Sequence, residues 1–136
     1  GYNAGSYFQH WIEVGKASDE SKLPKIFYVN WFRRDENNQF LWPGFGDNIR
    51  VLKWAFERID GVAAAADTPI GRVPTSDALD ITNLSLSAEQ VEKAVRVDAD
   101  EWRAELPQIG EWFEKIGDSL PSSMRDELDA LAQRLG

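Results

Sequence analysis

The stretch from Asn30 to Asn48 constrains the fold more than any other part of the chain. It gathers aromatic residues around Pro43-Gly44-Phe45-Gly46. This tetrapeptide excludes regular structure, because proline removes a backbone donor and glycine admits unusual dihedral angles. Any strand or helix must therefore end before it, and a new element must begin after it. The aromatic residues are Trp31, Phe32, Phe40, Trp42 and Phe45.

Short aromatic strands are expected before this loop. Ile26 to Phe32 is rich in aromatic and β-branched residues, which favours a strand. Residues 33–39 form a charged turn, and Phe40 to Trp42 is expected to return as a second short strand. After the loop, Asp47 is expected to cap a helix over residues 48–59.

The rest of the chain is expected to be mostly helical. An amphipathic helix around Trp11 is expected to end at Gly15. Ser87-x-x-Gln90 and Asp98-x-x-Glu101 resemble capping boxes that open two further helices, and Pro121 suits the first turn of a last one. We predict an α+β fold in which an aromatic strand–loop–helix unit is followed by a mostly helical tail.

Composition excludes several classes of site. Among 136 residues there is no cysteine and one histidine, His10, so disulfides and thiolate metal sites are impossible and a histidine-based metal site or triad is not expected. Neither the phosphate-binding loop Gly-x-x-x-x-Gly-Lys-Ser/Thr nor the Gly-x-Gly-x-x-Gly fingerprint occurs. No apolar run approaches the roughly 20 residues that span a bilayer.

The charge pattern favours a small anionic ligand over a nucleic acid. The net charge is −8, whereas binding to nucleic acid depends on Lys and Arg neutralising phosphates. Between Lys22 and Arg58, however, basic residues outnumber acidic ones. The chain opens without a signal-peptide pattern and without Met, and we expect it to be cut from a longer protein.

Two interpretations of the aromatic cluster remain open on residue chemistry. Aromatic residues on strands usually pack in a core. Against this, Phe45 lies between two glycines, and Phe32 and Phe40 flank a charged turn. Asn48 then offers a hydrogen-bond donor and an acceptor beside the rings. Such a place suits a flat purine, since base–aromatic stacking is worth about 1–3 kcal/mol per base.

The same stretch resembles a known family. Val29-Asn30-Trp31-Phe32-Arg33-Arg34, followed by Phe40-Leu41-Trp42-Pro43-Gly44-Phe45-Gly46-Asp47-Asn48, closely resembles the guanine-binding region of GTP-dependent phosphoenolpyruvate carboxykinases. The similarity extends to flanking segments, including Thr68-Pro69-Ile70-Gly71. It is strongest in the first half of the chain. The family often has Glu in place of Asp47 and a bulkier residue in place of Ala4.

The resemblance implies roles for six residues. Phe32 and Phe45 would lie on the two faces of guanine, and Phe40 would pack at the ring edge. Asn48 would hydrogen-bond the base, while Gly46 and Asp47 would lend backbone at close approach. Residues 1–61 would be the guanine-nucleotide-binding portion and residues 62–136 a helical tail, both part of a larger α/β enzyme.

The resemblance also implies an activity for the whole enzyme. It would convert oxaloacetate and GTP to phosphoenolpyruvate, GDP and carbon dioxide in gluconeogenesis, as a cytoplasmic monomer without nucleic-acid or membrane partners. Mn²⁺ and Mg²⁺ would be held by residues outside this segment. No catalytic residue or metal ligand is therefore expected within it, and the isolated segment should be inactive.

Two alternatives come from other classes of protein. A sugar-binding module could use clustered aromatic residues as platforms, which predicts exposed Trp31 and Trp42. A helical interaction domain could instead work through the acidic C-terminal half, and would keep its partner after deletion of residues 1–61.

Overall fold

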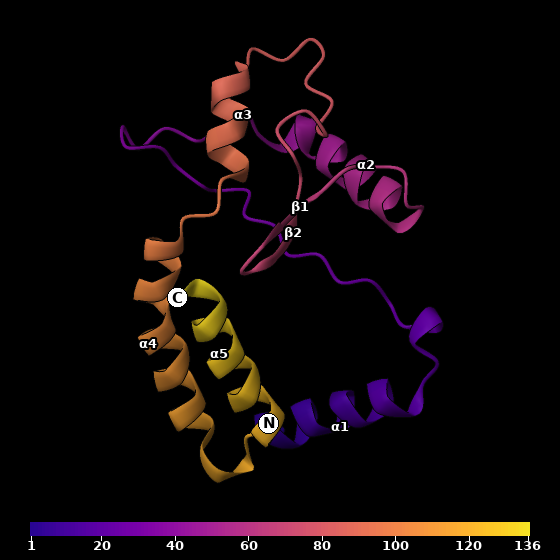
Figure 1. The fold of residues 1–136 in the computed structure, drawn as a ribbon, viewed down its shortest axis with the longest axis vertical. Helices are drawn as coiled ribbons and strands as arrows, with labels where there is room; N and C mark the ends of the chain where they lie inside the picture. Colours follow the sequence, from indigo (N-terminus) through magenta and orange to yellow (C-terminus); the bar gives the residue numbers. More distant parts are fainter. The chain divides into compact units, whose positions relative to one another are not determined.

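The computed structural model describes all 136 residues and contains five α-helices and one two-stranded antiparallel sheet, which confirms the α+β class. Figure 1 shows their order along the chain. None of the helices combines the length and the hydropathy needed to cross a bilayer. The helices are α1 (Ala4–Ala17), α2 (Asn48–Ile59), α3 (Ala88–Val95), α4 (Ala99–Ile116) and α5 (Ser122–Leu135); the strands are β1 (Ala66–Thr68) and β2 (Gly71–Val73); and the 3₁₀ turns are η1 (Glu20–Lys22), η2 (Phe45–Asp47) and η3 (Gly117–Ser119).

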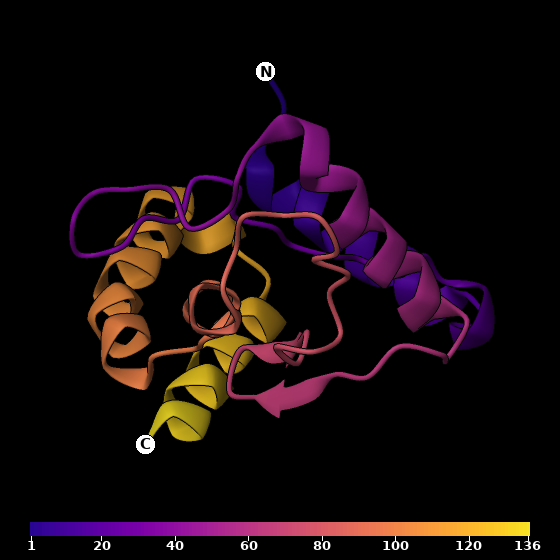
Figure 2. The same cartoon turned by 90° about the horizontal axis from the view of Figure 1, so that it is seen from above.

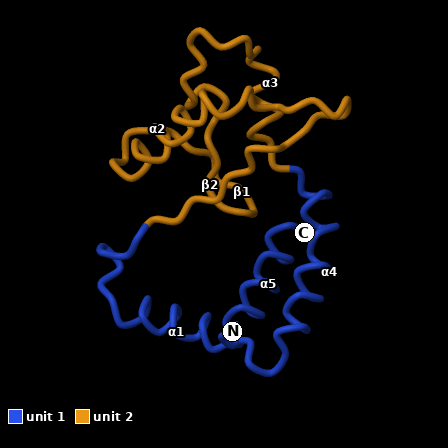
Figure 3. Tube along the Cα trace, turned by 180° about the vertical axis from the view of Figure 1, so that it is seen from behind, with its two compact units in different colours: residues 1–24, 98–136 blue, residues 25–97 orange.

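The chain divides into two compact units (Figure 3). One unit combines residues 1–24 with residues 98–136, and the other is continuous over residues 25–97. The sequence predicts a division by function, into residues 1–61 and residues 62–136, and its boundary does not coincide with the boundaries of these compact units. It stays a prediction.

In the first unit, α4 and α5 pack side by side and η3 joins them (Figure 1). Leu120 and Leu135 are buried there. The guanidinium of Arg103, on α4, donates to the carbonyl oxygen of Leu135 and so pairs one of the free carbonyls at the end of α5. The N-terminal turn of α1 contacts η3, where Gly5 approaches the backbone of Ser119.

In the second unit, a small apolar core is formed by α2, α3, the loop before α2 and the segment between the two helices. Its buried members are Trp42, Trp54, Leu79 and Val91. The indole N–H of Trp54 donates to the carbonyl oxygen of Ala64 at 3.0 Å. The buried ring therefore has no unpaired donor, which would be destabilising. The strands β1 and β2 form a short hairpin in the same unit, visible in Figure 2.

The predicted aromatic strands are wrong. Residues 25–30 are free of regular structure, and only an isolated bridge between Arg34 and Phe40 marks the turn. A strand exists only where a neighbouring strand pairs with its backbone, and no such partner lies along residues 26–32. The sheet forms instead on either side of Pro69-Ile70, where Ala66–Thr68 pairs with Gly71–Val73.

Two helix starts follow the expected local signals. Ser87 and Gln90 form a capping box at α3, and the Asp98 carboxylate accepts two backbone N–H groups at the start of α4. Gly61 follows α2 with a φ of 75°, a left-handed conformation that favours glycine. Two boundaries differ: α1 continues past Gly15 to Ala17, and Pro121 precedes α5 instead of lying in its first turn.

Candidate functional site

A tight turn over residues 33–41 builds one side of the candidate site. The backbone N–H of Asp35 donates to the carbonyl of Gln39 at 2.9 Å. The carboxylate of Asp35 accepts the N–H of Gln39 in return, at 2.8 Å. Asn38 takes a positive φ of 63°, which asparagine tolerates better than most residues. Short polar side chains thus close the turn, as the sequence predicts for this segment.

The turn brings two of the predicted rings together. The ring centroids of Phe32 and Phe40 lie 6.3 Å apart with planes inclined at 61°, an edge-to-face arrangement favoured by aromatic quadrupoles. The guanidinium carbon of Arg34 lies 4.2 Å from the centroid of Phe40. The Asn30 side chain accepts the N–H of Phe32 at 3.0 Å and fixes its backbone. Phe32 remains 74% exposed and Phe40 53% exposed.

The third predicted ring lies in the glycine-rich loop. Gly44 adopts φ 127° and ψ −165°, a combination accessible essentially only to glycine. The loop then enters η2, where Phe45 is 93% exposed. A Cβ atom added at Gly46 would meet nothing within 4 Å, so a ligand has open space beside that backbone. Phe45 makes no ring contact with Phe32 or Phe40.

Asn48 is the first residue of α2 and is half-buried. Its Oδ1 atom accepts a hydrogen bond from the indole Nε1–H of Trp42 at 3.0 Å. Trp42 is 8% exposed and belongs to the core of its unit. Both tryptophans of this region pack there, because Trp31 lies against the same cluster. The exposed Trp31 and Trp42 that a sugar platform requires are therefore absent.

Asp47 does not cap α2 with its side chain, contrary to expectation. Its backbone is already near-helical, with φ −100° and ψ −2°, whereas a capping residue needs an extended conformation. The carboxylate instead pairs with the guanidinium of Arg50 at 3.2 Å. The backbone N–H of Asp47 is used within η2, where it donates to the carbonyl of Gly44.

Arg50 ties the start of α2 to a distant loop. Its guanidinium donates to the carbonyl oxygens of Asp80 and Thr82 at 2.7 and 3.0 Å. The hydroxyl and the backbone N–H of Thr82 donate to the carboxylate of Asp80 and lower its pKa, and the nearby Arg50 lowers this pKa further. The negative charge of Asp80 is thus favoured where it meets Arg50.

Sequence reasoning named the exposed residues of the candidate site but not the side chains that support them. The partnership between Trp42 and Asn48 was missed, as were the contacts of Arg50. The only sequence signal was the position of Trp42, six residues before Asn48 across an irregular loop. Such a loop can fold a side chain back onto the next helix. No contact of Phe32, Phe40 or Phe45 in the structure identifies a ligand.

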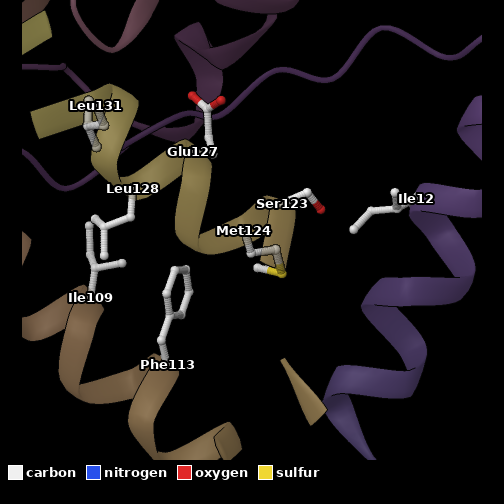
Figure 4. A pocket seen from close by; sticks show the side chains of 8 residues that line it. All are labelled: Ile12, Ile109, Phe113, Ser123, Met124, Glu127, Leu128 and Leu131. Carbon is white, nitrogen blue, oxygen red and sulfur yellow. The ribbon is translucent and has the colours of Figure 1, made fainter. Parts of the chain in front are cut away.

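The pocket in Figure 4 belongs to the other unit and has a different character. It has a volume of about 320 Å³. Figure 4 shows Ile109, Phe113 and Leu128 facing one another between α4 and α5. These side chains lie on the facing apolar sides of α4 and α5, and none is among the predicted site residues. Across the chain, no group of three or more His, Cys, Asp or Glu side chains is placed to hold a metal ion.

Comparison with known proteins gives one consistent family. Residues 1–134 match the family model described as the phosphoenolpyruvate carboxykinase C-terminal P-loop domain. A phosphoenolpyruvate carboxykinase (GTP) of Arthrobacter sp. (strain FB24) is 58% identical over 135 residues, which are 99% of this chain and 22% of the relative. Proteins of the same name from Renibacterium salmoninarum and Neocallimastix frontalis are 54% and 48% identical over 136 residues. The chain spans about a fifth of the length of these relatives (22%).

Proposed function

Because the chain belongs to the C-terminal domain family of GTP-dependent phosphoenolpyruvate carboxykinases, we propose that it forms part of an enzyme with that activity. The whole enzyme would convert oxaloacetate and GTP to phosphoenolpyruvate, GDP and carbon dioxide, a reversible step of gluconeogenesis. Its substrates are then small molecules, and this chain works with the remainder of its own polypeptide.

The part of the reaction assigned to this chain is recognition of the guanine base. Phe32 and Phe45 would stack on the two faces of the ring, and Phe40 would lie at its edge. Asn48 would hydrogen-bond the base, and Gly46 would let the backbone approach it. The observation that supports this role is the exposure of all three phenylalanine rings beside a core that buries Trp42. Rings that served the core would be buried with it.

The remaining chemistry is assigned to residues outside the chain. Transfer of a phosphoryl group depends on positioning and on charge stabilisation by metal ions and cationic side chains. We propose that the ligands of Mn²⁺ and Mg²⁺ and the groups that bind oxaloacetate lie in the rest of the polypeptide. We further propose a cytoplasmic monomer that binds neither nucleic acid nor membranes. The net charge of −8 disfavours binding to nucleic acid.

The test is a titration of the full-length protein that contains this chain, first with GDP and then with ADP, read by tryptophan fluorescence. Trp42 is a suitable reporter because its indole contacts Asn48 directly. We expect saturable quenching by GDP at a concentration at least tenfold below that required for ADP. Equal responses to the two nucleotides, or none, would contradict guanine recognition.

A further inference from the structure

The hydrogen bond between Trp42 and Asn48 joins the buried core to the proposed base-reading residue. From this bond we propose that Trp42 is a positioning residue for nucleotide choice: it fixes the Asn48 amide so that the site favours purines with an acceptor at position 6. The inference rests on the proposed function, because it requires that Asn48 faces the base.

The chemistry of the two side chains allows only one orientation of the amide. An indole nitrogen can donate a hydrogen bond but cannot accept one. Its partner must therefore be the carbonyl oxygen of Asn48, as the 3.0 Å contact shows. Turning the amide by 180° would place its NH₂ group against the indole N–H, donor against donor. The bond thus leaves the Nδ2 donor of Asn48 as the group available to a ligand.

That remaining donor distinguishes the two purines. At position 6 guanine carries an oxygen, which accepts a hydrogen bond, whereas adenine carries an amino group, which donates one. An Nδ2 donor pairs with the guanine oxygen and opposes the adenine amino group. A freely turning amide would satisfy either base, since its oxygen could accept from adenine. Discrimination between guanine and adenine therefore depends on the contact that fixes the orientation of the Asn48 amide, more than on the presence of asparagine.

The structure holds both partners firmly. Trp42 packs in the core with Trp54, Leu79 and Val91, so its indole has little freedom to follow a turning amide. The backbone N–H of Asn48 donates to the carbonyl of Phe45 as η2 passes into α2. A prearranged donor loses little conformational entropy when a ligand binds. The arrangement therefore favours the correct base before the ligand arrives.

The first test is Trp42→Phe in the full-length protein, with GDP and ADP affinities measured by calorimetry. This variant keeps an aromatic ring in the core and removes only the donor and one fused ring. We expect the ratio of ADP to GDP dissociation constants to fall about tenfold, which corresponds to one hydrogen bond of ordinary strength. The loss falls on GDP, while ADP binding is unchanged or tighter.

Trp54→Phe is the matched control. Trp54 is also buried, at 5% exposure, and its indole N–H also donates a hydrogen bond of 3.0 Å, but to the Ala64 carbonyl. It should lose similar thermal stability and keep the nucleotide ratio within about twofold. Equal falls in the ratio for both variants would reduce Trp42 to a packing residue.

Two further measurements identify the atoms involved. Inosine diphosphate keeps the oxygen at position 6 and lacks the 2-amino group, so Trp42→Phe should weaken it as much as GDP; an unaffected affinity would overturn the assignment to that oxygen. Trp42→His restores a ring N–H at the equivalent place while removing more core volume. It should recover part of the nucleotide ratio despite lower stability, which a purely structural role would not produce.

The outcomes separate this inference from the proposed function. An unsubstituted protein that does not prefer GDP would contradict the proposed function itself. A protein that prefers GDP and keeps its preference in Trp42→Phe would overturn only the positioning role. Should the Trp42 variants fail to fold, a crystal structure of the unsubstituted protein with GDP decides. We expect the indole N–H to remain on Asn48 and the Asn48 nitrogen to lie within hydrogen-bond distance of the guanine oxygen; another partner for either group would overturn the inference.

Discussion

At the scale of single residues, Phe45 gives the clearest separation between stability and binding. It is almost fully exposed and lies in a loop between two glycines, so it contributes little to the core. We expect Phe45→Ala to raise the dissociation constants of GDP and ADP alike by about ten- to a hundredfold, since stacking is worth about 1–3 kcal/mol. Calorimetry on the full-length protein would measure both constants.

A suitable control is Phe56→Ala, because Phe56 is also exposed but lies on α2, away from the glycine-rich loop. It should leave both nucleotide affinities unchanged. The melting temperature of Phe45→Ala should stay near that of the unsubstituted protein. A large fall in melting temperature, with little change in affinity, would return Phe45 to a structural role.

Residue chemistry predicted which side chains face outward but not which ones meet. The glycines beside Phe45 indicated an exposed ring, and the structure confirms that exposure. The bond from Trp42 to Asn48 depends on how an irregular loop folds back, and no local rule encodes that path. Asp47 shows the opposite failure: the local capping rule was applied, but Asp47 is the last residue of η2, and its near-helical backbone lies outside the capping conformation.

At the scale of secondary-structure elements, α1 offers a matched pair of glycines. A Cβ atom at Gly5 would overlap the backbone carbonyl of Ser119, whereas one at Gly15 would meet nothing within 4 Å. Gly5→Ala should therefore separate the start of α1 from η3, because a backbone atom cannot move aside as a side chain can. Gly15→Ala should leave the contact intact and stabilise the helix by about 0.5–1 kcal/mol.

Hydrogen exchange of peptides from α1, measured by mass spectrometry in the full-length protein, distinguishes the two variants. Exchange should be faster than normal in Gly5→Ala and normal or slower in Gly15→Ala. Equal exchange rates in the two variants would show that the close approach of Gly5 to Ser119 does not hold α1 in place.

Helices were predicted better than strands for a physical reason. Helix starts are marked by side chains within one turn, such as Ser87 with Gln90, so a short window of sequence contains the signal. A strand instead needs a partner, and aromatic composition cannot say whether one lies alongside. Residues 26–30 lack regular structure and residues 31 and 32 lie in a turn, while the less apolar β1 and β2 pair across a two-residue turn.

At the scale of the whole molecule, we expect the isolated segment of residues 1–136 to show no carboxykinase turnover. The chain spans 22% of its relatives, and the proposed catalytic groups lie in the remainder. Coupled assay of oxaloacetate consumption, with the full-length protein as positive control, would measure this. Turnover by the segment alone would overturn the assignment of the metal and oxaloacetate sites to the rest of the polypeptide.

We expect the rest of the polypeptide to cover part of the exposed apolar surface of this chain. Ile26 and Tyr28 are 90% and 91% exposed, although large apolar side chains are usually buried in a complete protein. In hydroxyl-radical footprinting we expect both residues to be labelled in the isolated segment and protected in the full-length protein. Phe45 should be labelled in both, because a base site must open to solvent, and protected only when GDP is added to the full-length protein. Equal labelling of Tyr28 in the isolated segment and in the full-length protein would mean that this surface stays uncovered. Protection of Phe45 in the full-length protein without nucleotide would mean that the rest of the polypeptide covers Phe45 as well, and Phe45 would then not belong to the base site.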